Sequence, residues 1–208
     1  MVQAVIAGGE PAIRRSVEGA EDDAGAGAES VRRLGVGERD VVLGISSGGT
    51  TPFVQGALRQ ARESGGKTVF FACVPREQFP DEADVSIRVL TGPEVLTGST
   101  RLKAGTATKL LLNMVTTLSM TRLGKVHENL MVDVNCNANA KLTDRGVRIL
   151  QSLTHLERPA AARLLEQAGG RVKTALVMHA AGISREEVDE RLARAGGRIA
   201  LALKASAG

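Results

Sequence analysis

The hydrophobic residues of this chain form short continuous runs in its first part and follow a helical spacing in its last part. Four runs, at residues 2–6, 41–45, 67–73 and 85–90, have the length and the apolar content of strands. They are continuous rather than alternating with polar residues. Such strands are buried on both faces, which predicts a mainly parallel sheet.

The segments between these strands have the pattern of helices. Residues 11–17 open with proline, residues 52–64 end at two glycines, and residues 105–123 form a long apolar stretch without proline. Strands that alternate with helices are typical of an α/β fold, here a doubly wound, mainly parallel sheet. We place this first domain at residues 1–150.

The last part of the chain, residues 151–208, is rich in Leu, Ala and Arg and is broken by glycines near residues 169, 182 and 196. This pattern predicts three short helices in a small C-terminal subdomain. The sequence SREEV, which begins at Ser184, has the Ser-x-x-Glu spacing of a capping box and predicts a helix start.

Composition narrows the functional classes. Of 208 residues, 43% are hydrophobic and 24% charged, as in a soluble α/β protein. The net charge of +4 comes from scattered Lys and Arg, and only 2% of residues are aromatic, so we expect no nucleic-acid partner. No long apolar run or secretory leader is evident, so we expect no membrane association and a cytoplasmic location. Cys73 and Cys136 lack metal-site spacing, which predicts two buried thiols and no metal.

The segment GPEVLTGSTRLKAGTATK, from Gly92 to Lys109, joins a predicted strand to the long helix. Unpaired N–H groups and the positive dipole end favour an anion at a helix start. Hydroxyls and cations of this segment could bind the same anion; these are Ser99, Thr100, Arg101 and Lys103. In the alternative, Thr97 or Ser99 caps the helix and the cations face solvent.

A second polar loop follows the strand at residues 41–45, at the edge of the sheet where open α/β proteins bind ligands. Its hydroxyls, Ser46, Ser47, Thr50 and Thr51, flank Gly48 and Gly49. Glycine lets the backbone approach an anion closely, and hydroxyls donate hydrogen bonds to it. An ordinary polar turn is the alternative.

An acidic cluster, VEGAEDD at residues 17–23, is the candidate for proton transfer. Mutual repulsion and partial burial can raise the pKa of a carboxyl group toward that of a general base. Acidic clusters are, however, more often solvated surface. Elsewhere, Glu94 could meet a sugar hydroxyl or pair with Arg101, and we interpret His127, His155 and His179 as structural.

Four stretches together resemble one family. They are IAGGEPAIRRSVEGAEDD, VVLGISSGGTTPFVQGAL, GPEVLTGSTRLKAGTA and GKVHENLMVDVNCNANAKLTDR, and they cover most of the first 150 residues in order. Each is similar to the corresponding motif of the N-acetylmuramic acid 6-phosphate etherases, a branch of the sugar isomerase (SIS) fold to which the glucokinase regulatory proteins are related.

The resemblance implies roles for particular residues. The second glutamate of EGAED, here Glu21, corresponds to the catalytic base, with Glu18 and Asp22 as supporting groups. The Ser/Thr-rich loop would hold the sugar phosphate. This chain departs from the family pattern there, because Gly48 replaces an expected serine and Thr50 an arginine found in many members.

The resemblance also implies a reaction. The family cleaves the D-lactyl ether of N-acetylmuramic acid 6-phosphate to N-acetylglucosamine 6-phosphate and D-lactate, in cell-wall amino sugar recycling. No metal or organic cofactor is expected, and the expected assembly is a homodimer. Family members begin earlier, with a strand and a glutamate that serves as the general acid. The sequence thus lacks the family's N-terminal third, which we interpret as a truncated reading frame rather than a two-gene arrangement or a decayed relative.

A second functional class is a non-catalytic sugar-phosphate regulator that resembles the glucokinase regulatory proteins. These proteins share the EGAEDD motif and the GSTRLKAGTA motif, but they bind their ligand without converting it. Gly48 leans slightly toward this class. An SIS-type aldose–ketose isomerase is a more distant third possibility, because such enzymes do not usually carry both motifs.

Overall fold

The computed structural model describes residues 2–204 and divides into two compact units, Met1–Leu112 and Asn113–Gly208. We call them the sheet unit and the helical unit. The helix α4 (Lys103–Arg122) begins in the first and ends in the second. It matches the long helix predicted at residues 105–123. In the described part of the chain, no helix is both long and apolar enough to span a membrane.

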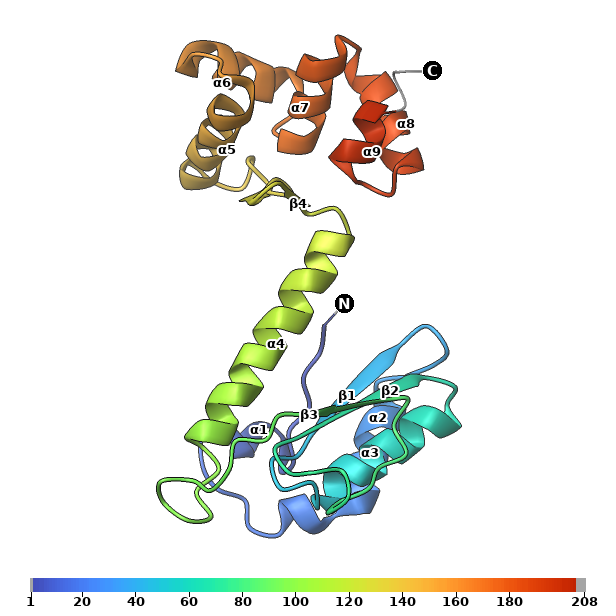
Figure 1. Cartoon of the computed structure of the whole chain (residues 1–208). Coiled ribbons are helices and arrows are strands. Elements are labelled where there is room, and N and C mark those ends of the chain that lie inside the picture. Colours follow the sequence, from blue (N-terminus) through green and yellow to red (C-terminus); the bar gives the residue numbers. More distant parts are fainter. Residues whose placement is uncertain (1, 205–208) are drawn as a thin grey trace. The chain divides into compact units, whose positions relative to one another are not determined.

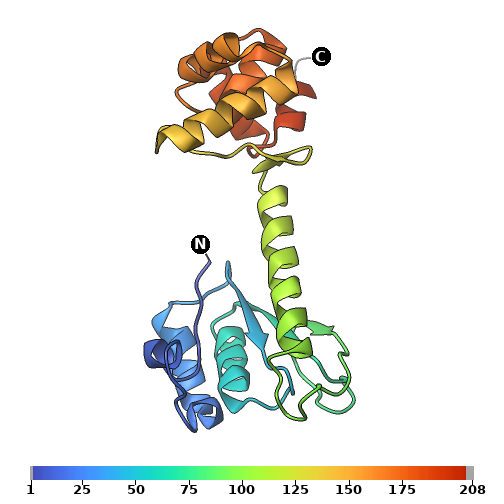
Figure 2. The same ribbon diagram turned by 90° about the vertical axis from the view of Figure 1, so that its left-hand side faces the viewer.

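The sheet unit holds a parallel sheet in the order β1-β2-β3 (Figure 1). Its strands are β1 (Val41–Ile45), β2 (Lys67–Ala72) and β3 (Val85–Arg88). Leu58 of α3 (Pro52–Glu63) packs on one face with Phe70. Ala104 of α4 packs on the other face with Phe71, and Figure 2 shows α3 and the start of α4 on opposite sides of the strands. Helices on both faces explain why the apolar runs are continuous, and the α/β prediction is confirmed.

The helix α2 (Ala24–Arg33) lies beside α3 and was not predicted from the sequence. Two glycines let these helices approach closely. A Cβ at Gly27 would lie 1.9 Å from the carbonyl oxygen of Phe53, and one at Gly56 would lie 2.0 Å from that of Ala24. Only glycine, which has no Cβ, fits at these two positions.

Two predictions for the N-terminal segment are wrong. Residues 2–6 form no strand in the described structure: β1 is hydrogen-bonded to β2 alone, and Val2 is 72% exposed. The helix predicted at residues 11–17 is only α1 (Gly9–Ala12). It ends in a tight turn, in which the Ile13 N–H donates to the Glu10 carbonyl (3.2 Å) and the Arg14 N–H donates to the Pro11 carbonyl (3.1 Å).

The helical unit contains a β-hairpin and five further helices within the described residues. The hairpin joins β4 (Val126–His127) to β5 (Leu130–Met131), and the helices are α5 (Ala140–Thr154), α6 (Arg158–Gln167), α7 (Val172–Ala181), α8 (Arg185–Arg194) and α9 (Ile199–Lys204). Four of them, rather than the predicted three, lie in residues 151–204. The additional one follows Gly196 and Gly197, where the chain turns and helical structure resumes. The division at residue 150 stays a prediction.

The helical unit has one continuous core. Leu150, Val172 and Val177 are fully buried at its centre, and Cys136 packs against Gly146, where a Cβ would lie 2.4 Å from the Cys136 sulfur. The predicted capping box is confirmed, because the Ser184 hydroxyl accepts from the Glu187 N–H (3.3 Å) and the Glu187 carboxylate accepts from the Ser184 N–H (2.9 Å).

Candidate functional site

The loop Ser46–Thr51, which we call the hydroxyl loop, extends from the carboxyl end of β1 to the start of α3. The Ser46 N–H donates to the Phe71 carbonyl (3.0 Å), and the Cys73 N–H donates to the Ser47 carbonyl (2.9 Å). The loop therefore begins as a continuation of the parallel ladder between β1 and β2. This places its hydroxyls beyond the carboxyl ends of the strands, as the sequence predicted.

Ser46 organises this loop from within. Its hydroxyl is buried, lies 2.8 Å from the Thr51 hydroxyl oxygen, and accepts from the N–H groups of Gly49 (3.1 Å) and Thr51 (3.4 Å). The hydroxyls of Ser47 and Thr50 have no hydrogen-bond partner within residues 2–204. The four predicted phosphate ligands thus divide into an inner pair that shapes the turn and an outer pair with free hydroxyls.

The start of α4 carries an anion supplied by the chain itself. One carboxylate oxygen of Glu94 accepts from the Lys103 N–H (2.9 Å), and the other accepts from the Ala104 N–H (3.0 Å). These two bonds hold the pKa of Glu94 below its usual range. The sequence assigned this position to an incoming anion or to a Thr97 or Ser99 cap. It did not indicate that Glu94 folds back over the helix start.

Lys103 closes the same loop from the other side. Its ammonium group donates to the carbonyl oxygens of Pro93 (2.8 Å) and Thr91 (3.2 Å). The considered pairing of Glu94 with Arg101 is absent from the described structure, in which Glu94 accepts from the N–H groups of Lys103 and Ala104. Ser99 is half-buried, Thr100 and Arg101 are exposed, and none of their side chains has a partner in the described structure. We call the segment between β3 and α4 the signature loop. These three groups, together with the exposed hydroxyl of Thr97, are polar side chains of this loop without a partner in the described structure.

Glu21 lies in a single 3-10 turn, η1 (Ala20–Asp22), with its side chain exposed. Two residues later, Asp23 begins α2 by accepting from the Ala26 N–H (2.8 Å). The Ala24 carbonyl then lies against Gly56 in the first half of α3, so the acidic turn is next to the helix that begins at the hydroxyl loop. The carboxylate itself forms no hydrogen bond or ion pair within the described residues.

The cysteines and histidines lie apart from these loops or are buried, and a structural role for the histidines stays a prediction. Both cysteines are buried, as predicted, and burial raises the pKa of each thiol. His127 is half-buried in β4, whereas His155 is exposed just after the end of α5 and His179 is exposed on α7. The described residues contain no cluster of three or more side chains suited to a metal ion.

The parallel sheet, with helices on both faces and a hydroxyl-rich loop beyond the end of β1, is an α/β domain of the SIS class. The glucokinase regulatory protein N-terminal SIS domain family matches residues 1–62. Proteins named N-acetylmuramic acid 6-phosphate etherase are similar over nearly the whole chain. One from Gloeobacter violaceus is 56% identical over 207 residues, and one from Synechocystis is 53% identical over 206. The chain belongs to the N-acetylmuramic acid 6-phosphate etherase family.

The matches cover nearly all of this chain but only part of each relative. The alignments cover 100% and 99% of this chain but 67% of the two relatives. A third relative, from Crocosphaera subtropica, is 52% identical over 205 residues, which are again 67% of its length. The chain therefore spans about two thirds of the proteins that it matches.

Proposed function

We propose that this chain catalyses the reaction for which its relatives are named, cleavage of the D-lactyl ether of N-acetylmuramic acid 6-phosphate. The observation that carries this proposal is the identity of 52–56% to etherases over essentially every residue of the chain. The free hydroxyls beyond the sheet supply suitable chemistry for a phosphorylated sugar.

The phosphate is expected to lie against the hydroxyl loop. Ser47 and Thr50 have free donors, and the buried Ser46–Thr51 contact keeps the turn in one shape. Ser99, Thr100 and Arg101 add two hydroxyls and a positive charge from the signature loop. Holding an open-chain sugar at its phosphate fixes the distance of its reacting carbons from a catalytic group, which is a large contribution for a flexible substrate.

Glu21 is the proposed catalytic base. In the open-chain aldehyde, the carbonyl acidifies the proton on C2, and the carboxylate removes it. Lactate then leaves from C3 with its ether oxygen protonated by a general acid. Water adds its oxygen to C3 of the unsaturated aldehyde, C2 takes back a proton, and the remaining proton of the water restores the general acid. The balance is one water consumed, with N-acetylglucosamine 6-phosphate and D-lactate formed. The exposed carboxylate of Glu21 is free to accept this proton, because no ion pair engages it in the described structure.

Glu94 and Lys103 are proposed to fix the signature loop around the substrate. Both are tied to their own loop, Glu94 to the N–H groups of α4 and Lys103 to the carbonyls of Thr91 and Pro93. A sugar hydroxyl can still share the Glu94 carboxylate, whose oxygens each have further lone pairs.

The test is lactate release from N-acetylmuramic acid 6-phosphate in deuterated water, followed by NMR. The Glu21→Gln variant should lose at least roughly a hundredfold in rate, the scale of general-base catalysis, and should fail to exchange the C2 proton. Glu10→Gln is the matched control, since it removes an exposed carboxylate on α1 outside the acidic cluster and should keep most of the rate. Equal rates for Glu21→Gln and the parent chain would remove Glu21 from the mechanism.

The second candidate is a sugar-phosphate regulator, favoured by the match of residues 1–62 to the glucokinase regulatory protein domain and by Gly48 in the hydroxyl loop. It binds the sugar phosphate without releasing lactate. Phosphate-dependent binding by a folded chain that shows neither lactate nor C2 exchange would establish it in place of the etherase.

We also propose that the chain works in the cytoplasm as a homodimer. Leu110, Met114 and Leu118 recur every fourth residue along α4, with exposures of 49%, 56% and 62%, and so form an apolar stripe on one helix face. Contiguous apolar surface of this kind is typical of an interface. Sedimentation equilibrium should give twice the 21.8 kDa chain mass, and a strictly monomeric chain would refute the dimer.

A further inference from the structure

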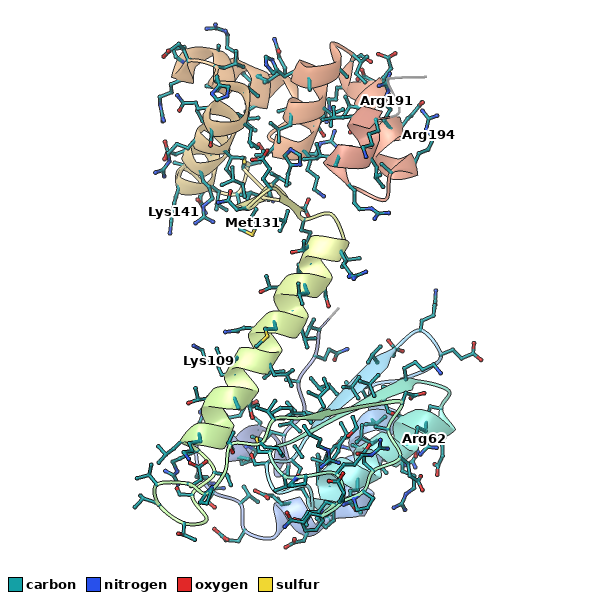
Figure 3. The ribbon with its side chains drawn as sticks, viewed as in Figure 1. Arg62, Lys109, Met131, Lys141, Arg191 and Arg194 are labelled. Carbon is teal, nitrogen blue, oxygen red and sulfur yellow. The ribbon has the colours of Figure 1, made fainter. Side chains whose placement is uncertain are left out.

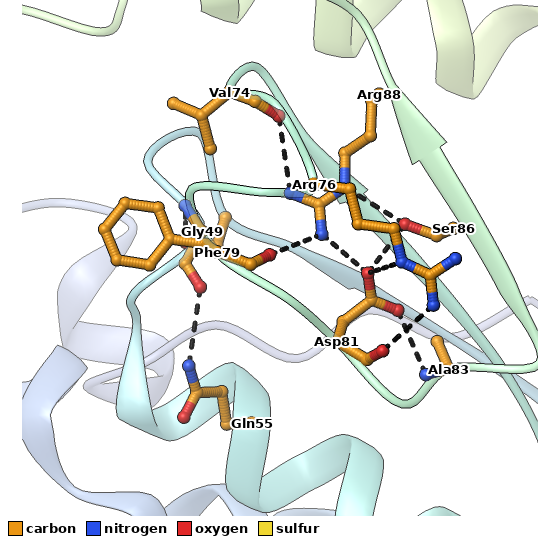
Figure 4. Close-up of polar contacts among 10 residues, drawn as sticks. Gly49, Gln55, Val74, Arg76, Phe79, Asp81, Ala83, Ser86 and Arg88 are labelled. Carbon is orange, nitrogen blue, oxygen red and sulfur yellow. Dashed lines mark hydrogen bonds and ion pairs between the residues drawn. The ribbon is translucent and has the colours of Figure 1, made fainter.

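A buried ion pair lies beside the hydroxyl loop and has no part in the chemistry proposed above (Figure 4). Arg88, the last residue of β3, donates from Nη2 to Asp81 Oδ2 at 2.6 Å, and the two side chains are only 11% and 9% exposed. Burying two charges costs desolvation energy, so such a pair contributes little net stability by itself. Its further contacts therefore indicate a role other than stability.

Asp81 is held in one orientation. Its carboxylate accepts from the Ser86 hydroxyl (2.7 Å) and the Ala83 N–H (3.0 Å) in addition to Arg88. Burial acts to raise the pKa of Asp81, but these donors outweigh it and the net pKa is lowered, so the group stays ionised. A fixed carboxylate in turn fixes the guanidinium that it binds.

Arg88 uses its remaining donors on the loop between β2 and β3. Nη2 donates to the Phe79 carbonyl at 2.9 Å, and Nη1 donates to the Val74 carbonyl at 3.4 Å. The guanidinium also lies 4.9 Å from the centre of the Phe70 ring. One planar side chain thus joins both ends of the segment from Val74 to Phe79, which a lysine could not do in the same geometry.

The two residues held by Arg88 are the ones that press on Gly49. A Cβ at Gly49 would lie 3.0 Å from Phe79 Cβ and 3.3 Å from Val74 Cγ2, and the residue has a φ of +85°. On its other side, the Gly49 N–H donates to the Ser46 hydroxyl, and its carbonyl accepts from Gln55 (3.4 Å). Gly49 is therefore fixed between the Arg88-bound wall and the inner hydroxyls of the loop.

We propose that Arg88 is a positioning residue that sets the conformation of the Ser46–Thr51 loop through Val74 and Phe79, and so sets its affinity for the sugar phosphate. The affinity part rests on the proposed function. The conformational part concerns Gly49 alone and can be measured without any ligand.

The experiment compares three variants of the full chain. Arg88→Lys keeps the charge beside Asp81 but loses the fork that reaches both carbonyls. Phe79→Ala leaves the ion pair intact, keeps Phe79 Cβ, and removes the ring, whose Cγ would lie 3.3 Å from a Cβ at Gly49. Arg76→Gln is the matched control, because Arg76 also approaches Asp81, at 3.7 Å, yet binds neither the Phe79 nor the Val74 carbonyl.

Two quantities are measured for each folded variant: the hydrogen-exchange rate of the Gly49 amide by NMR, and the Kd for N-acetylglucosamine 6-phosphate by calorimetry. Arg88→Lys and Phe79→Ala should each raise the exchange rate and the Kd roughly tenfold, since a small displacement of a positioned group has effects of at least that size. Binding of unphosphorylated N-acetylglucosamine should not change. Arg76→Gln should stay within about twofold of the parent chain in both quantities, as expected for an exposed partner.

Each other outcome decides the question. Unchanged Gly49 exchange in folded Arg88→Lys and Phe79→Ala overturns the positioning role, and faster exchange without weaker sugar-phosphate binding overturns its link to affinity. If Arg88→Lys does not fold, the same two measurements on Phe79→Ala decide the positioning role. A parent chain that binds no sugar phosphate refutes the proposed function, whereas the exchange rates still decide whether Arg88 sets the loop.

Discussion

The two units of this chain bury their apolar residues in different ways. The helical unit closes around one cluster of sixteen buried residues, and after residue 123 its large exposed hydrophobic side chains in the described structure are only Met131 and Leu201. The sheet unit has two small clusters of three buried residues each, one on either face of the sheet. Val2, Leu90 and Val95 are among its many apolar side chains that stay more than 60% exposed.

The larger hydrophobic core and the candidate site residues lie in different units. Beyond residue 123, the helical unit buries most of its large apolar side chains in its own core. The sheet unit carries the hydroxyl loop, the signature loop and Glu21, and many of its apolar side chains stay exposed. Figure 3 shows Lys109 projecting outward from α4, so charged and apolar side chains both extend from this helix.

The largest expected effect on stability lies in the helical unit. Leu150 is fully buried, so Leu150→Ala removes apolar contacts and leaves a cavity, which should lower the free energy of unfolding of this unit by about 3 kcal/mol. Hydrogen exchange followed by mass spectrometry reports each unit separately. Protection should fall in residues 132–204 and stay unchanged in the sheet.

Leu118→Ala is the control for this substitution, because its side chain is 62% exposed on α4. It should change the unfolding free energy of the isolated chain by less than about 0.5 kcal/mol. Equal losses for Leu150→Ala and Leu118→Ala would show that the helical unit has no core of its own.

A smaller loss is expected where the sheet unit relies on backbone contact. Gly56→Ala places a Cβ 2.0 Å from the Ala24 carbonyl oxygen, so α2 and α3 must separate, at a cost of about 2 kcal/mol. Denaturant unfolding monitored in the sheet unit measures this loss of unfolding free energy. Gly105→Ala is the matched control: its Cβ would meet the Thr100 carbonyl at an ordinary 3.5 Å, and helix propensity should make it neutral or slightly stabilising. Similar losses at both glycines would contradict the close helix crossing.

The smallest effect is expected at the capping box of the helical unit. Ser184→Ala removes the acceptor for the Glu187 N–H and should lower the unfolding free energy by about 1 kcal/mol. Chemical denaturation measures the difference against Ser152→Ala, an exposed position on α5 without a side-chain hydrogen bond, where alanine should cost nothing. Equal stability of the two variants would mean that α8 does not depend on its cap.

Much of the sheet unit could be predicted from local sequence. The runs at residues 41–45 and 67–73 became β1 and β2 within one residue, because burial on both faces leaves a continuous apolar pattern. The run at residues 2–6 has the same composition but forms no strand, since a strand also needs a hydrogen-bonded neighbour and the ladder of β1 goes to β2. Composition alone does not carry that information.

The candidate site divides in the same way. The sequence by itself determined where the hydroxyls, the signature loop and Glu21 lie along the chain, because glycine, serine and acidic motifs are local and are shared with the etherase family. Only the tertiary structure decided that Ser46 faces inward, that Glu94 occupies the start of α4, and that Arg88 reaches Phe79 behind Gly49. These contacts join residues five to nine positions apart. Residue types alone do not predict them, because their formation depends on how each loop folds back to bring donors and acceptors within about 3 Å of one another.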